Sequence, residues 1–96
     1  MARRPAAPKF KRAEHGYAYG PLGLVKEGPR WMIVHLPTSS TMRAACTLFR
    51  ALRDAKAACV EILPLTDWTH DDPEVYGNAI LFERVRTIAR QHGGVR

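Results

Sequence analysis

Side chains that could act as bases, nucleophiles or metal ligands are scattered along this chain. They comprise four histidines and two cysteines, which are His15, His35, His70, His92, Cys46 and Cys59. A zinc site draws three or four ligands together, usually from closely spaced pairs, and these residues form no such pair. The densest cluster, 70–72, ends in Asp72, whose carboxylate is suited to cap a helix that begins at Pro73. We therefore expect no bound metal ion and no cofactor.

A cysteine nucleophile beside a histidine base is the second chemistry that these residues could support. Cys46 and Cys59 both lie in segments that we expect to be regular and buried. A thiol in apolar surroundings keeps its proton and does not react. His35 lies among apolar residues, where a histidine is usually a hydrogen-bonded part of the core. Because nothing marks an activating neighbour for either thiol, we expect that the protein is not an enzyme.

The charge distribution points instead to binding of a macromolecule. The chain has 96 residues and a formal net charge of +6. Residues 1–15 hold five basic side chains and one acidic one, so most of the excess lies in an N-terminal arm. A cationic arm attracts polyanions such as nucleic acid, because binding releases their condensed counterions, although such an arm can also serve only as a solubilising tail. The basic residues of the arm are Arg3, Arg4, Lys9, Lys11 and Arg12.

Arginines on two predicted helices would extend this basic surface. They are Arg43, Arg50 and Arg53 on the first helix, and Arg84, Arg86 and Arg90 on the second. A strand and a long loop separate the two helices, whereas a helix-turn-helix motif has a short turn. We therefore expect contacts to the backbone of a nucleic acid, alone or in a nucleoprotein complex, with little preference for sequence.

A small protein that binds and modulates another protein is the competing interpretation. Aromatic residues and arginine are enriched among the residues that dominate binding energy at interfaces. Four aromatic residues are expected to be exposed, namely Tyr17, Tyr19, Trp68 and Tyr76. A short chain rich in alanine and arginine is also typical of accessory proteins of bacterial mobile elements, phage or plasmid, including inhibitors that act on host defence complexes. The sequence leaves both interpretations open.

The elements that would position these residues predict an α+β fold. Residues 1–16 form the expected flexible basic arm, and residues 17–96 a single domain of the usual size. Residues 17–36 predict a β-hairpin, with its turn over 26–30. Residues 31–36 carry apolar side chains on both faces, which predicts a central strand.

Two helices and one further strand complete the expected domain. Apolar residues at helical spacing predict a helix over about 40–57, capped by hydroxyl groups of residues 38–41. Residues 59–63 resemble a third strand, and a second helix is expected over about 73–92, with Gly93 and Gly94 as its stop. We therefore predict a small, mainly antiparallel sheet packed with two helices.

Two further expectations concern partners and location. If both helices pack on one face of the sheet, the other face is left for the arm or for a second subunit, so a homodimer is possible. The longest apolar run is far shorter than the roughly 20 residues that cross a bilayer, and the N-terminus lacks the apolar core of a signal peptide. We therefore expect a cytoplasmic protein with no membrane partner.

Overall fold

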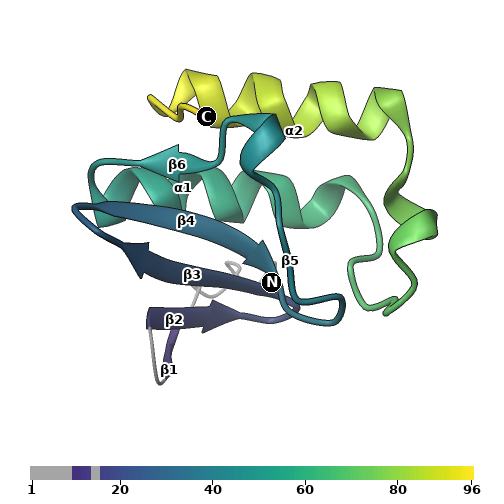
Figure 1. Cartoon of the computed structure of the whole chain (residues 1–96), viewed down its shortest axis with the longest axis horizontal. Coiled ribbons are helices and arrows are strands. Elements are labelled where there is room, and N and C mark those ends of the chain that lie inside the picture. The colour runs from purple at the N-terminus through teal and green to yellow at the C-terminus, as the bar shows by residue number, and fades with distance from the viewer. Residues whose placement is uncertain (1–9, 14–15) are drawn as a thin grey trace, which may run out of the picture.

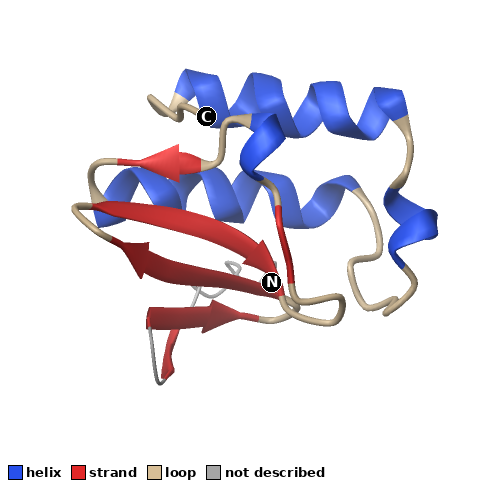
Figure 2. Ribbon diagram, viewed as in Figure 1, coloured by secondary structure: helices blue, strands red, loops and turns tan. Residues whose placement is uncertain are grey.

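The computed structural model describes residues 10–13 and 16–96, and they form an antiparallel sheet packed with two α-helices (Figures 1 and 2). This confirms the predicted α+β class. In the described part of the chain the strands are β1 (Lys11–Ala13), β2 (Gly16–Tyr19), β3 (Leu22–Glu27), β4 (Arg30–His35), β5 (Ser40–Thr41) and β6 (Leu48–Phe49). The helices are α1 (Leu52–Ile62) and α2 (Ala79–Gln91), with short 3-10 helices at Arg43–Ala45, Leu63–Leu65 and Pro73–Tyr76.

Strands β1 to β4 form a meander in which each strand pairs with the next, antiparallel. Two Gly-Pro dipeptides make its turns: Tyr19 pairs with Leu22 across Gly20 and Pro21, and Glu27 pairs with Arg30 across Gly28 and Pro29. Both glycines have φ +58°, in the left-handed region that favours glycine and at the first central turn position. The second edge of β4 pairs with β5 and β6, so β4 is the predicted central strand.

One face of the sheet forms the core with α1. Leu24 and Ile33, which are directly paired on β3 and β4, are almost fully buried. Helix α1 turns mainly small side chains toward the core, which lets it lie close to the strands, namely Ala55, Ala58, Cys59 and Ile62. Helix α2 lies along α1 and buries Val85 and Ala89 (Figure 1). None of the helices in the described part of the chain is long and apolar enough to cross a bilayer.

The predicted strand over 59–63 is wrong, because residues 59–62 are the last turn of α1. An apolar run of this length fits a buried strand or a buried helix equally well when it is considered alone. The buried residues Ala55, Ala58, Cys59 and Ile62 follow the spacing i, i+3, i+4 and i+7, which continues a helix across the run. The tertiary core therefore decided between the two.

The predicted helix over 40–57 is wrong in its first half. Residues 40–49 form β5, a 3-10 turn and β6 in place of helical turns. Cys46 has φ 61°, which no α-helix accommodates, and α1 begins only at Leu52. Residues 38–41 therefore cap no α-helix, although Ala45 and Phe49 are buried as the helical pattern predicted.

The second predicted helix is split in two. The Asp72 carboxylate does accept a hydrogen bond from the Glu74 amide (3.0 Å), but it caps the 3-10 helix Pro73–Tyr76. Helix α2 starts later, where Asn78 Oδ1 accepts from the Ile80 amide (2.8 Å). It ends as predicted, two residues before Gly93, whose φ is +81°.

Part of the predicted arm, residues 11–13, belongs to the sheet, so the arm is shorter than predicted. Lys11–Ala13 forms the edge strand β1, paired with β2, and Phe10 packs against the core. Residues 1–9 and 14–15, with Arg3, Arg4 and Lys9, lie outside the described residues.

The second face of the sheet has no α-helix packed on it in the described part of the chain. Its apolar residues include Val25 and Met32, which pair directly, and Val34, which follows on β4. Met32 is nevertheless buried, and Val25 and Val34 are half-buried, so this face is only partly exposed and the homodimer stays a prediction.

The Thr47 hydroxyl offers a test of the packing. It is fully buried and has no hydrogen-bond partner among the residues described. We predict that Thr47→Val raises the free energy of unfolding by about 1 kcal/mol, because an unsatisfied buried polar group is removed at nearly constant shape. Urea denaturation measures the change. Thr47→Ser keeps the hydroxyl, loses the methyl group and should lower the free energy of unfolding. If Thr47→Val lowers it by the same amount, the Thr47 hydroxyl is not an unsatisfied buried group.

Candidate functional site

Two pairs of aromatic rings lie on the face of the sheet that α1 covers, between the start of β1 and the central strand β4. Tyr17 and Tyr19 share this face because side chains alternate along β2, and they pair with the core residues Leu24 and Leu22. Phe10 stacks on Tyr19 with ring centroids 4.7 Å apart and an interplanar angle of 23°. Trp31 on β4 lies 5.8 Å from Tyr17, at 47°. All four rings are half-buried.

Positive charges lie between these rings. The Lys56 ammonium, from α1, lies 4.5 Å from the ring centroid of Tyr17 and 5.3 Å from that of Phe10. The Lys26 ammonium lies 5.3 Å from the ring centroid of Trp31. Each of these distances is within the range of a cation–π contact. Within the described part of the chain, neither lysine takes part in a salt bridge.

Arg12 completes this cluster from the edge strand. It is exposed and pairs directly with Tyr17, which places both side chains on the same face. We call the cluster the basic-aromatic strip, and its members are Phe10, Arg12, Tyr17, Tyr19, Lys26, Trp31 and Lys56. Among the described residues it contains three cations and no acidic residue.

A recess of about 320 Å³ adjoins the strip. Its walls are Phe10, from the start of β1, and Lys56, Ala57 and Val60, from one flank of α1. The walls are therefore an aromatic ring and short aliphatic groups, with one ammonium group. Such a recess suits a flat apolar body that carries a nearby negative charge.

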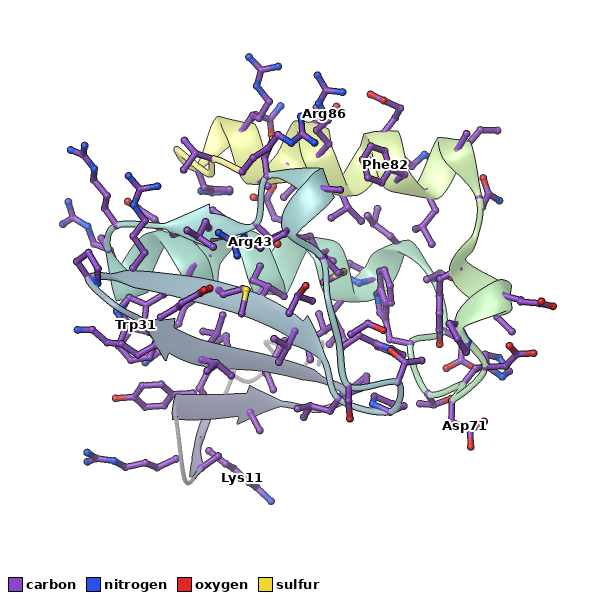
Figure 3. The ribbon with its side chains drawn as sticks, viewed as in Figure 1. Lys11, Trp31, Arg43, Asp71, Phe82 and Arg86 are labelled. Atoms are coloured by element: carbon purple, nitrogen blue, oxygen red, sulfur yellow. The ribbon has the colours of Figure 1, made fainter. Side chains whose placement is uncertain are left out.

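The predicted basic residues that the structure describes do not form one surface. Lys11 and Arg86 lie at opposite ends of the molecule, on β1 and α2, with the sheet and α1 between them (Figure 3). Arg43, Arg53 and Arg86 each have an acidic partner, at 3.6 Å (Glu27), 4.0 Å (Asp54) and 3.5 Å (Glu83) respectively. Arg50, Arg84 and Arg90 are exposed. Of the predicted basic residues that the structure describes, only Arg12 belongs to the strip.

Two of the four aromatic residues expected at the surface are structural. Trp68 is 4% exposed, and its indole Nε1 donates to the Ile62 carbonyl oxygen (3.0 Å). Tyr76 stacks on Trp68 at 5.2 Å, and its hydroxyl donates to the Asp67 carbonyl oxygen (3.0 Å). The expected exposure of Trp68 is therefore wrong, because this pair fastens the loop between α1 and α2. Tyr17 and Tyr19, in contrast, belong to the strip.

His35 has the expected structural role. It is 3% exposed, and its Nε2 donates to the Trp68 carbonyl oxygen at 2.5 Å. Nδ1 then accepts from the Thr38 hydroxyl at 2.7 Å. With both ring nitrogens engaged, His35 joins β4 to the Trp68 loop.

The candidate ligands and nucleophiles stay apart. In the described ranges no three histidine, cysteine or acidic side chains come together as a metal site would require. Cys46 and Cys59 are free and buried. Burial raises the pKa of the Cys59 thiol to about 12, which keeps it protonated.

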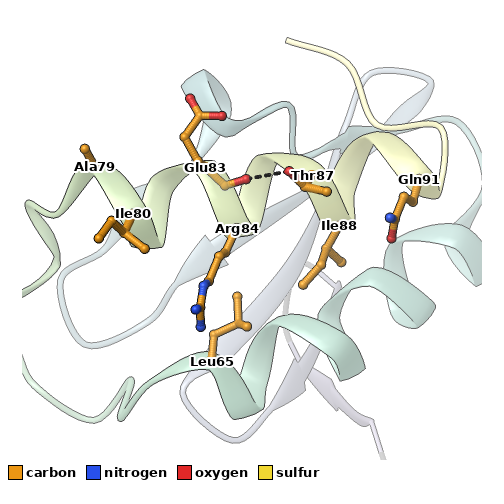
Figure 4. Close-up of a pocket in the computed structure, with 8 residues that line it drawn as sticks. All are labelled: Leu65, Ala79, Ile80, Glu83, Arg84, Thr87, Ile88 and Gln91. Atoms are coloured by element: carbon orange, nitrogen blue, oxygen red, sulfur yellow. Dashed lines mark hydrogen bonds between the residues drawn. The ribbon is translucent and has the colours of Figure 1, made fainter.

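A second hollow lies between Leu65 and the outer side of α2, with a volume of about 670 Å³ (Figure 4). Arg84 extends toward Leu65 across it, and the Thr87 hydroxyl donates to the Glu83 carbonyl oxygen (2.8 Å). Its charged walls are one acid, Glu83, and one base, Arg84. With one charge of each sign, the hollow does not select for a charged partner. The described residues of the strip, in contrast, carry only positive charges.

The sequence did not indicate Phe10, Lys26, Trp31 or Lys56 as site residues. Its pattern places Trp31 on a core face of a strand, and Lys56 within the first helix. Phe10 and Lys56 lie far apart in the chain and meet only in the tertiary structure, where the Lys56 ammonium lies 5.3 Å from the centroid of the Phe10 ring. The one available local signal was the mixture of basic and aromatic residues over 9–19.

Comparison with protein families, with curated proteins and with solved structures finds no match to this chain.

The structural role of Trp68 is testable. We predict that Trp68→Ala lowers the free energy of unfolding by about 3–5 kcal/mol, because it opens a cavity and removes the anchor of the loop. Trp31→Ala, at a half-buried ring, is the matched control and should cost less. Urea denaturation compares the two, and equal losses would contradict the assignment of Trp68 to the core.

The protonation of Cys59 is testable by thiol labelling in a Cys46→Ser variant. With a pKa of about 12, the thiolate fraction at pH 8 is about one in ten thousand. We expect a disulfide reagent to label Cys59 only after urea unfolds the protein. Labelling of the folded protein at the rate of an exposed thiol would contradict the burial.

Proposed function

We propose that this protein binds nucleic acid through the basic-aromatic strip and catalyses no reaction. The observation that carries the proposal is the Lys56 ammonium, which lies within about 5 Å of two aromatic rings on neighbouring chain segments. Lys56 lies between two pairs of rings, Phe10 with Tyr19 and Tyr17 with Trp31, so the strip offers both ring faces for bases and cations for phosphates. The cytoplasm is the expected setting.

The charge of the strip supports a polyanionic partner. Arg12 and Lys26 are exposed, and Lys56 is half-buried, so all three can reach phosphate groups. Phosphate contacts position a protein on nucleic acid and carry no information about base sequence. Ring stacking is also tolerant of sequence, because every base has a π face. We therefore expect weak sequence preference.

A protein partner is the competing proposal, including a host defence complex as the target of a mobile-element product. The strip would then act as an aromatic and basic hot spot on an acidic protein surface. Its three cations without an acidic member fit a polyphosphate backbone better than the mixed charges of most protein surfaces. A nucleoprotein complex could satisfy both interpretations, with the strip on its nucleic acid.

Fluorescence anisotropy with a generic duplex and a generic single strand, at low and physiological salt, tests the proposal. The key variant is the double substitution Arg12→Ala/Lys26→Ala. We expect the slope of log K against log salt to fall by about 0.7–0.9 for each phosphate that the variant can no longer neutralise, according to the form of the nucleic acid. Lys56 is not substituted, because its ammonium also contacts the Phe10 and Tyr17 rings and its loss would disturb the structure of the strip.

Two matched controls separate the strip from the other basic segments. Arg86→Ala/Arg90→Ala removes two charges from α2 and should change the slope little. Deleting residues 1–9 removes Arg3, Arg4 and Lys9 but keeps β1, and should leave a salt-dependent remainder. If the α2 variant loses as much affinity as the strip variant, the strip is not the site. If no form binds at either salt, the proposal fails and a protein target takes its place.

A further inference from the structure

We propose that the strip binds an unpaired single strand, with bases stacked on its rings and one base in the recess beside Phe10. This inference rests on the proposed function and specifies the form of the nucleic acid. The observation behind it is the combination of half-buried rings with ammonium groups at 4.5–5.3 Å from their centroids.

Half-burial prepares the rings for stacking. Each ring is already held by two contacts, Phe10 by Tyr19 and the Lys56 ammonium, and Trp31 by Tyr17 and the Lys26 ammonium. Little side-chain freedom of the rings therefore remains to be lost on binding. Each ring is also partly exposed. A base can therefore stack without first ordering the site.

The recess supplies a place for a whole base. Its wall of Phe10, Ala57 and Val60 is apolar and its volume is about 320 Å³. The Lys56 ammonium lies at its margin, between Phe10 and Tyr17, where a phosphate that links two stacked nucleotides would be neutralised. Lys26 can serve in the same way beside Trp31.

A duplex cannot use these features. Its bases stack on one another and offer only their edges in the grooves, so the faces that aromatic rings recognise are already covered. Base–aromatic stacking contributes about five- to a hundredfold in affinity for each base. A strip that bound only phosphates would gain no affinity from the ring faces.

The test compares three probes of similar length: a thymidine single strand, a strand of the same backbone charge whose sites are abasic, and a duplex. A length of about sixteen nucleotides covers the usual site sizes of single-strand-binding domains, roughly 4–16 nucleotides. We expect the thymidine strand to bind at least about fivefold more tightly than the abasic strand, since at least one base stacks. Stacking on Trp31 should also quench its emission, and a Trp31→Phe variant, which keeps only the buried Trp68, should show no quenching.

Variants of one ring sharpen the comparison. Tyr17→Leu should lose about fivefold or more of the affinity for the thymidine strand and little for the abasic strand. Tyr17→Phe keeps the ring and should keep the affinity. Phe82→Leu removes an exposed ring from α2 and is the control for a general loss of aromatic surface. If Tyr17→Leu does not fold, two measurements on the unsubstituted protein still test the proposal. They are the relative affinities for the thymidine and abasic strands, and the quenching of Trp31 emission.

The outcomes separate this inference from the proposed function. Equal, salt-sensitive binding of thymidine and abasic strands would overturn stacking and leave phosphate binding by the strip in place. Tighter binding of the duplex than of the single strand would do the same. Absence of binding to all three probes would overturn both.

Discussion

The strip exists because α1 packs directly on the sheet. Ala55, Ala58 and Cys59 have no exposed surface, and they belong to the same core cluster as Leu24 and Ile33. Small residues let the helix and sheet approach, and the removal of their apolar surfaces from water is the main stabilising contribution. This packing also fixes the rotation of α1 about its axis. One flank of the helix is thereby brought beside Phe10, which forms a recess with Lys56 and Val60, and the Lys56 ammonium reaches the Tyr17 ring.

The rings of the strip serve stability and the proposed function together. An edge strand of three residues such as β1 has few ladder hydrogen bonds, so side-chain contacts contribute a large share of its attachment. The stack of Phe10 on Tyr19 and the contact of Lys56 with both Phe10 and Tyr17 supply such contacts. The exposed cations Arg12 and Lys26 contribute less to the attachment of β1. Function and stability can therefore be separated at those two residues more cleanly than at the rings.

The loop between the helices is held by a separate network. His35 bonds to the Trp68 carbonyl oxygen and to Thr38, and Tyr76 packs edge-on against His35 at 4.7 Å. Between α1 and α2, His92 is also hydrogen-bonded to Glu61. The contacts of His35 satisfy ring nitrogens that would otherwise be buried without partners. They account for aromatic and histidine residues that chemistry alone could have marked as functional.

The sequence by itself determined the parts of this protein that local chemistry controls. Gly28 with Pro29 marked a turn, the apolar residues on both faces of 31–36 marked a central strand, and Gly93 marked the end of a helix. Only the tertiary structure decided that 59–62 is helical and that Phe10 meets Lys56. The physical reason is that periodicity records which residues avoid water, whereas the choice of which apolar surfaces meet depends on the packing of the whole core.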